Sequence, residues 1–359
     1  MIIDELSLEE KIGQMLMIGL KDKNNEQIEK LIKENKIGGV ILYKNNYNNY
    51  ENMKQFVNNI KSLNKENKIP IFISIDQEGG RVNRIPPDVL NIKSATKLAE
   101  TKNVETIKES GKIIGKMLNK TGISIDYAPI LDIRRFEEFH PIGDRCYGQN
   151  KQEVAKYAIE FMKELQLQKV ISVIKHFPGH GLTKKDSHFR IPKIKEKINV
   201  LENEDMYHFK VAIENGSDAI MLGHLIIKDI DKRYPASLSK KIIQQYLIKK
   251  YNYKGLIITD DFKMMAIRVH YNIKKAVKLA INAGNDIIML GFSSEKINEI
   301  IKYIVKQVKK GKILEEDIND SVKKIIEMKE KYKITDEKIS CFDIEEINYK
   351  ISNLNSKVI

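Results

Sequence analysis

The sequence predicts an α/β protein with a (β/α)₈ barrel, and three observations support this prediction. Short apolar runs alternate along the chain with longer amphipathic runs rich in Lys and Glu, as expected where strands alternate with helices. There are eight apolar runs, which is the strand count of such a barrel. Four glycines fall where a helix should end before the next strand begins: Gly122, Gly216, Gly255 and Gly284.

The expected strands are short and rich in Ile, Val and Leu, which is typical of parallel strands buried on both faces. They lie at residues 15–18, 39–42, 71–75, 123–127, 170–174, 219–222, 256–259 and 286–290. The expected helices repeat apolar residues at helical spacing between these strands. They lie at residues 26–34, 50–64, 95–120, 151–165, 201–215, 240–251, 273–283 and 294–309.

The chain of 359 residues has room for one large α/β domain or two smaller ones, and shows no repeat, low-complexity tract or linker between two large domains. Length and strand count favour a single-domain (β/α)₈ TIM-like barrel over the alternative, an open doubly wound sheet. We expect the barrel to cover residues 1–332 and a short C-terminal extension to cover residues 333–359. For residues 339–351 two outcomes stay open: an amphipathic helix packed on the barrel, or a frayed tail.

Charge and cysteine content indicate what the protein binds and where it works. The formal net charge is +13, but the excess is nearly all lysine on predicted helix faces, so we expect a solvated surface and no nucleic-acid partner. The two cysteines, Cys146 and Cys341, argue against a disulfide framework and fit a reducing compartment. Acids near the N-terminus and the lack of any membrane-length apolar run predict a cytoplasmic protein with no membrane partner.

Residues 170–188 carry the strongest functional signal. The stretch starts as a buried strand and ends in a polar loop that proline and glycine keep irregular. Residues 175–188 include three of the seven histidines of the chain together with a lysine and an aspartate: His176, His180, His188, Lys175 and Asp186. Charged side chains at the carboxyl end of a buried strand mark the usual place for sites in α/β proteins.

Asp186 and His188 are two residues apart, so their side chains share a face in an extended loop. A carboxylate that accepts from one ring nitrogen fixes the imidazole tautomer and leaves the other nitrogen to exchange protons near neutral pH. The structural alternative is an Asx turn beside a solvated histidine, and the neighbouring ionisable groups favour the catalytic interpretation. We expect no metal and no cofactor, because Pro178 and Gly179 prevent a helix that would align His176 with His180, and no phosphate-binding glycine motif is present.

Polar side chains follow five consecutive strands, where a barrel keeps its active site. They are Asp76 and Arg81 after the third strand, Asp132, Asp144 and Arg145 after the fourth, Lys175 and His176, His224, and Asp260 and Asp261 after the seventh. We expect Asp260 to point into the barrel mouth and Asp261 to point away and cap a helix. An ion pair between Asp76 and Arg81 at the rim is a structural expectation beside a binding role for these residues. An ionised acid among several donors suits a polyhydroxylated ligand.

Several motifs resemble the β-N-acetylglucosaminidases of glycoside hydrolase family 3. The most specific is KHFPGHG at 175–181, followed after four residues by DSH at 186–188. The others are LSLEEKIGQMLMIG near the start, IDQEGGRV at 75–82, GDRCYG at 143–148 and ITDDFKM at 258–264, in matching order and spacing. The resemblance implies a TIM-like barrel and covers the chain to about residue 332.

The resemblance also implies roles for individual residues in a retaining, exo-acting hydrolase. It implies that Asp260 is the nucleophile and that His188, oriented by Asp186, is the general acid/base. It implies sugar contacts at Asp76, Arg145, Lys175 and His176. The implied substrate is a small amino sugar, terminal non-reducing β-linked N-acetylglucosamine, often from cell-wall muropeptides; no metal or organic cofactor is implied, and we expect a monomer or weak homo-oligomer.

This chain departs from the family pattern at Leu182, where relatives commonly have aspartate, which bears on how the loop is tethered. Three alternatives stay open. On the same fold, the enzyme would be a β-glucosidase, or a phosphorylase that uses phosphate in place of water. From another class, the chain would be a non-catalytic sugar-binding barrel.

Overall fold

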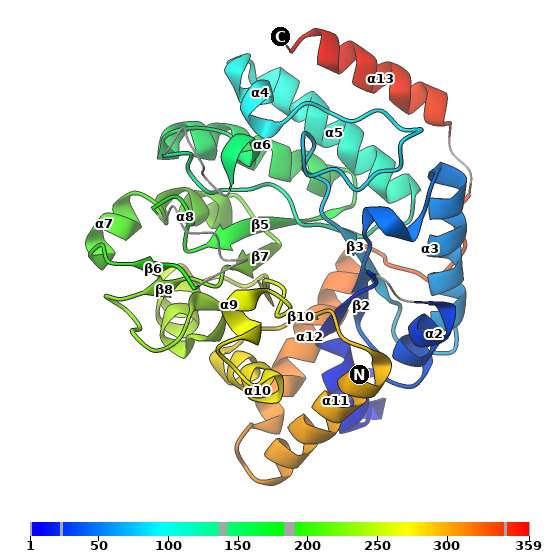
Figure 1. The fold of residues 1–359 in the computed structure, drawn as a ribbon, viewed down its shortest axis with the longest axis vertical. Helices are drawn as coiled ribbons and strands as arrows, with labels where there is room; N and C mark the ends of the chain where they lie inside the picture. Colours follow the sequence, from blue (N-terminus) through cyan, green and yellow to red (C-terminus); the bar gives the residue numbers. More distant parts are fainter. Residues whose placement is uncertain (1, 22–23, 136–141, 183–190, 341–342, 359) are drawn as a thin grey trace.

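The computed structural model describes residues 2–21, 24–135, 142–182, 191–340 and 343–358 (Figure 1). Eight parallel strands form one sheet in the order β10-β1-β2-β3-β4-β5-β7-β9. Their bounds are β1 (Leu16–Gly19), β2 (Gly39–Ile41), β3 (Phe72–Ile75), β4 (Ile125–Asp126), β5 (Ile171–Phe177), β7 (Ala219–Leu222), β9 (Leu256–Thr259) and β10 (Ile288–Leu290).

The sheet closes on itself between its first and last strands. Ile258 forms a parallel bridge with Ile287, and the Thr259 backbone N–H donates to the Ile287 carbonyl oxygen at 3.0 Å. The Thr259 hydroxyl oxygen also accepts from the Met289 N–H at 3.1 Å. The predicted (β/α)₈ TIM-like barrel is therefore confirmed, and the open doubly wound sheet is excluded.

Helices surround the strands on the outside of the barrel (Figure 1). They are α1 (Leu8–Gln14), α2 (Asn25–Lys33), α3 (Tyr50–Asn64), α4 (Ala95–Glu100), α5 (Val104–Lys120), α6 (Lys151–Leu167), α7 (Ile198–Asn203), α8 (Tyr207–Glu214), η5 (Ile242–Lys250), α9 (Met265–Arg268), α10 (Ile273–Ala283), α11 (Ser294–Lys309), α12 (Glu315–Lys331) and α13 (Ile344–Ser356). Short 3₁₀ turns are η1 (Ile2–Glu5), η2 (Lys44–Asn46), η3 (Gly143–Arg145) and η4 (Ala236–Leu238).

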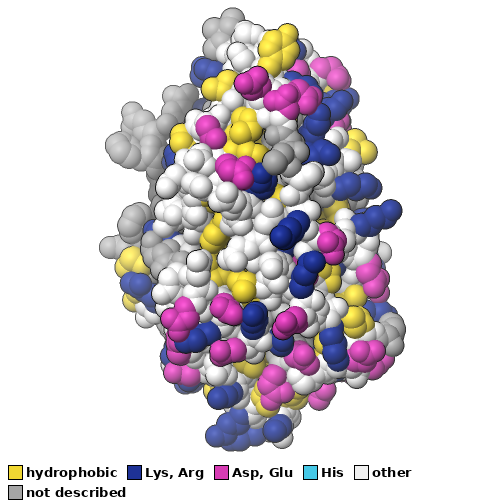
Figure 2. Space-filling model, turned by 90° about the vertical axis from the view of Figure 1, so that its right-hand side faces the viewer, with side chains coloured by type: hydrophobic (Ala, Val, Ile, Leu, Met, Phe, Trp, Pro, Cys, Tyr) yellow, Lys and Arg dark blue, Asp and Glu magenta, His cyan; other side chains and the backbone are white. Residues whose placement is uncertain are grey.

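Local sequence explains where several helices begin. Ser7 and Glu10 form a capping box at α1, and Asn150 caps α6 by accepting from the Glu153 N–H. The apolar residues that follow at helical spacing, such as Ile297 and Ile304 of α11, are fully buried against the barrel. The solvent-facing sides are charged, and Figure 2 shows lysines, arginines and acids interspersed over the face it presents.

The structure corrects two of the expected helices. The single helix predicted at 95–120 is two helices, α4 and α5. The chain breaks at Lys102, which has φ +54°, and Asn103 then caps α5 by accepting from the Glu105 N–H. The helix predicted at 201–215 is also two, α7 and α8, and α7 starts at Ile198. Apolar spacing continues across both breaks, so periodicity alone could not show them.

A small second sheet and a C-terminal helix lie outside the barrel sheet. Strands β6 (Lys193–Ile194) and β8 (Ile226–Ile227) pair in parallel and form a small second sheet. Helix α13 packs on α5 through the ion pairs Lys116–Glu346 and Lys357–Glu109. Among the described residues, none of the helices combines the length and apolar character needed to cross a membrane.

Candidate active site

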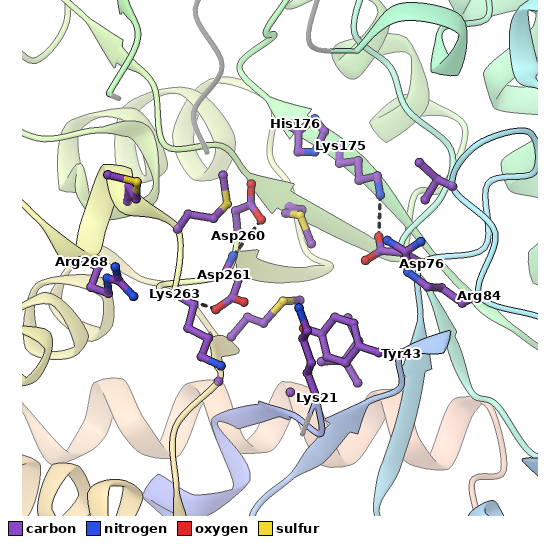
Figure 3. A pocket seen from close by; sticks show the side chains of 18 of the residues that line it. Lys21, Tyr43, Asp76, Arg84, Lys175, His176, Asp260, Asp261, Lys263 and Arg268 are labelled. Carbon is purple, nitrogen blue, oxygen red and sulfur yellow. Dashed lines mark hydrogen bonds and ion pairs between the residues drawn. The ribbon is translucent and has the colours of Figure 1, made fainter. Parts of the chain in front are cut away.

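A cavity of about 600 Å³ opens at the carboxyl ends of the barrel strands (Figure 3). Its volume lies within the usual range for small-molecule sites. Five of the seven predicted site residues line it: Asp76, Arg145, Lys175, His176 and Asp260. The other two, Asp186 and His188, lie outside the residues that the structure describes. The cavity therefore gathers groups from β3, η3, β5 and the end of β9.

Lys175 is the centre of a buried ion network on one side of the cavity. Its Nζ lies 2.7 Å from Asp76 Oδ1 and 2.6 Å from Glu78 Oε1, and its side chain is 2% exposed. Glu78 also accepts from Arg145, at 2.7 Å from Nε and 2.6 Å from Nη2. These contacts fix both cations beside the ligand space, and they use two of the three N–H donors of Lys175.

The network keeps Glu78 and Lys175 charged although burial opposes their charge. Burial alone raises the pKa of Glu78, but Arg145 and Lys175 outweigh burial and hold that pKa well below its usual range. Burial alone lowers the pKa of Lys175, but Asp76 and Glu78 outweigh burial and raise it. A ligand in the cavity therefore meets donors and acceptors in fixed positions, with little rearrangement required.

His176 is oriented from behind by Asp132. Its Nδ1 lies 2.7 Å from Asp132 Oδ2, and the same carboxylate accepts from the backbone N–H groups of His176 and His180, the latter at 2.6 Å. Burial raises the pKa of Asp132, but His176 and His180 outweigh burial and lower it to about 2. Because an ionised carboxylate only accepts, Nδ1 carries a proton and Nε2 remains for the cavity side.

The turn after His176 packs on a second buried acid, Asp205. Arg135 Nη2 donates to Asp205 Oδ2 at 2.8 Å, and burial raises the pKa of Asp205 to about 6. A Cβ added at Gly181 would lie 2.9 Å from Asp205 Oδ1, so only glycine allows this close approach. Asp205 and Arg135 therefore support the segment that leads from β5 toward residue 182.

Asp260 follows β9 directly and is held by its own neighbours. Its Oδ1 accepts from the Asp261 N–H at 2.8 Å, and its backbone N–H donates to the Leu222 carbonyl oxygen of β7 at 3.1 Å. His224 Nε2 lies 3.1 Å from the Asp261 carbonyl oxygen, so this nitrogen carries the proton, and Nδ1 lies 2.8 Å from Ser237 Oγ. His224 is fully buried and fixes the turn that presents Asp260.

Three expectations from the sequence are wrong. Asp261 does not point away, because it lines the same cavity as Asp260 while its Oδ1 accepts from the Lys263 N–H at 2.8 Å. Asp76 does not pair with Arg81; it pairs with Lys175, while Arg81 pairs with Asp144 at 3.0 Å. Of the groups expected at the barrel mouth, Asp132 and His224 are fully buried behind the cavity wall.

Several residues of the site were not singled out from the sequence. Glu78 is two residues after Asp76 in the same polar run, and its position after a strand was the available signal. Tyr43 follows β2 and lines the cavity, but no site residue was predicted after that strand. Further lining residues that were not predicted as site residues include Lys21, Arg84, Lys263, Met264, Met265 and Arg268.

The described part of the chain contains no group of three His, Cys, Asp or Glu side chains arranged to hold a metal ion. Cys146 is a free thiol behind Arg145, and burial raises its pKa well above the usual value. The cavity instead combines an acid held on a rigid turn with cations, an imidazole and a second acid. Such a set can bind several hydroxyls of one sugar and place a carboxylate near its reacting carbon.

Comparisons with known proteins identify the family to which the chain is similar. The profile of the glycosyl hydrolase family 3 N terminal domain matches residues 7–328. A beta-hexosaminidase of Haemophilus influenzae is 32% identical over 292 residues, which is 80% of this chain and 82% of that protein. A beta-hexosaminidase of Methylobacillus flagellatus is 30% identical over 271 residues, 74% of this chain and 76% of that protein. The structure of a family 3 beta-N-acetylglucosaminidase from Paenibacillus superposes with a TM-score of 0.92 at 29% identity, covering 98% of this chain and 69% of that one.

Proposed function

The chain belongs to glycosyl hydrolase family 3, and from this membership we propose a retaining exo-β-N-acetylglucosaminidase that removes terminal, non-reducing β-linked N-acetylglucosamine. The chain is a glycoside hydrolase. The observation that carries the finer proposal is the position of Asp260 in one cavity with Asp76, Lys175 and His176. This arrangement supplies a carboxylate nucleophile opposite a set of hydroxyl-binding groups.

In the proposed complex, the terminal sugar lies against the buried ion network. Asp76 accepts from one or two hydroxyls, while Arg145 and Lys175 donate to hydroxyl oxygens from fixed positions. His176 donates or accepts through Nε2, since Asp132 already holds Nδ1. Because these groups are preorganised, sugar binding requires little loss of side-chain freedom.

The proposed chemistry takes two steps. Asp260 attacks the anomeric carbon, the bond from that carbon to the leaving oxygen breaks, and His188 protonates the leaving oxygen. Water then attacks the glycosyl ester, His188 takes a proton from that water, and Asp260 is released. The roles of His188 and its partner Asp186 are proposed from the family motif, and both lie outside the described residues. The location of this reaction is proposed to be the cytoplasm.

The test compares aryl glycosides that share the same leaving group and differ in the sugar. We expect 4-nitrophenyl β-N-acetylglucosaminide to be hydrolysed with free N-acetylglucosamine as product, and the matched β-glucoside to react far more slowly. Inorganic phosphate should not change the product. A sugar 1-phosphate as main product would contradict hydrolysis, and preference for the β-glucoside would contradict the amino-sugar assignment. Asp260→Asn should abolish turnover, and turnover like the wild type would contradict the nucleophile.

A further inference from the structure

The cavity contains two groups of cations that differ in their partners. The inner cations, Arg145 and Lys175, are both neutralised by Glu78. The outer cations have no ion pair with any acid in the described part of the chain, and they are Lys21, Arg84, Lys263 and Arg268. Unpaired cations inside a cavity attract an anionic ligand, whereas the cations on the face shown in Figure 2 are interspersed with acids.

Lys263 and Arg268 lie on one side of Asp260, and Asp76 and Lys175 of the buried ion network lie on the other side (Figure 3). Lys263 is two residues after Asp261, and Arg268 is the last residue of α9. Asp76 and Lys175 lie across the cavity from them (Figure 3). If the sugar hydroxyls bind to Asp76 and Lys175, the anomeric carbon faces Asp260 and the leaving group extends toward Lys263 and Arg268.

Both cations line the cavity from solvent-exposed positions. The Lys263 side chain lies against Gly291, where an added Cβ would come within 2.5 Å of Lys263 Cδ. A side chain at 291 would therefore displace the lysine stem from this position. Met264 and Met265 line the cavity between the two cations along the chain, and Met265 is 39% exposed. This wall thus offers an apolar surface flanked by positive charges, which suits an organic group that carries a negative charge.

We propose that Lys263 and Arg268 select substrates whose leaving group carries a negative charge, a carboxylate or a phosphate. This inference rests on the proposed function and goes further, because it assigns the leaving-group side of the cavity to an acidic aglycone. The two cations touch the aglycone only, so they determine specificity and take no part in bond breaking. The binding energy comes from ion pairs at a partly exposed wall, and added salt therefore weakens it.

The test uses two aryl β-N-acetylglucosaminides with nearly equal leaving groups. One aglycone is 3-(carboxymethyl)phenol, and the other is its uncharged methylamide. In low salt we expect the wild type to favour the acid in kcat/KM by about fivefold or more, and about 0.5 M NaCl should reduce this ratio toward one. Lys263→Gln/Arg268→Gln should bring the ratio to about one at every salt concentration, and Arg268→Lys should retain part of the preference.

The matched control is Lys275→Gln/Lys302→Gln, which removes the same charge from exposed positions on α10 and α11 that do not line the cavity. This control should keep the wild-type ratio. Equal kcat/KM for both substrates in the wild type would overturn the inference, and so would an unchanged ratio in Lys263→Gln/Arg268→Gln. Phosphate-dependent formation of a sugar 1-phosphate that disappears in the same variant would assign the cations to free phosphate instead. Turnover of neither substrate would contradict the proposed function itself.

Discussion

Glu78 and Arg145 are 67 residues apart in the chain, and the Glu78 carboxylate accepts two hydrogen bonds from the Arg145 guanidinium group, at 2.7 and 2.6 Å. The same carboxylate contacts Lys175 at 2.6 Å. One buried acid therefore pairs with two cations and aligns both with the cavity. Glu78 does not line the cavity itself, so it acts on a ligand only through these partners.

Glu78→Gln should destabilise the protein, because it leaves two buried cations with one remaining acid, Asp76. We expect the free energy of unfolding to fall by about 3 kcal/mol, measured by denaturant titration. We also expect KM for the aryl glycoside to rise. Asp144→Asn is the control, since its pair with Arg81 is half exposed and should contribute less than about 1 kcal/mol. A similar loss in both variants would contradict the special role of Glu78.

Asp132→Asn should reduce catalysis by misplacing His176. The asparagine oxygen can accept only part of the three hydrogen bonds that the carboxylate now accepts from His176 and His180. We expect kcat/KM to fall on the order of 10²-fold. Asp231→Asn is a matched control, because Asp231 is a buried acid that also accepts backbone N–H groups and does not line the cavity. A fall of the same size in Asp231→Asn would indicate general loss of structure.

His188→Ala should affect substrates according to their leaving group. A leaving group that is a weak base needs little protonation, so the variant should lose less activity on a 4-nitrophenyl glycoside than on a disaccharide. The comparison of kcat/KM for the two substrates in both enzymes measures this effect. Equal losses on both substrates would argue against an acid role for His188.

Because of the buried Lys329, we expect the free energy of unfolding to rise with pH. This lysine is fully buried at the amino end of the barrel, where Nζ donates to Gln14 Oε1 at 2.9 Å and to the Gly38 carbonyl oxygen at 3.0 Å. Burial lowers its pKa to about 7, so between pH 7 and about 10 the unfolded chain binds a proton that the folded protein lacks. Stability should therefore increase over that range, by up to roughly 4 kcal/mol.

The measurement is the free energy of unfolding at several pH values in wild type and Lys329→Met. The variant should lose this part of the pH dependence, since it has no group to titrate there. Lys323→Met, at an exposed position of the same helix, should keep the wild-type slope. Identical slopes in Lys329→Met and the wild type would contradict the assignment.

The sequence predicted the barrel because parallel strands buried on both faces need runs of Ile, Val and Leu, as at 170–174. It also pointed to Asp76, Lys175 and Asp260, since a side chain directly after a barrel strand reaches the cavity with little ambiguity. Arg145 lies further from its strand, on η3, and was placed with the sugar-binding groups through the family motif. The structure brings all four into one cavity.

The pairing of distant groups could not be predicted in the same way. Whether Asp76 contacts Arg81 or Lys175 depends on side-chain directions at a strand end, and Lys175 is 99 residues away in the chain. The burial of Asp132 and His224 depends on how loops fold back over the strands. That Lys263 and Arg268 have no ion pair among the described residues is likewise a property of the assembled cavity, since nearly every helix of this chain carries lysines.

The central claim is that Asp260 forms a covalent bond with the anomeric carbon of an N-acetylglucosamine unit. Incubation with a 5-fluoro N-acetylglucosaminyl fluoride, followed by proteolysis and mass spectrometry, tests this claim most directly. We expect one added glycosyl group on the peptide that contains Asp260, and none in Asp260→Asn. A label on another residue, or turnover with inversion of the anomeric configuration and no label, would contradict it.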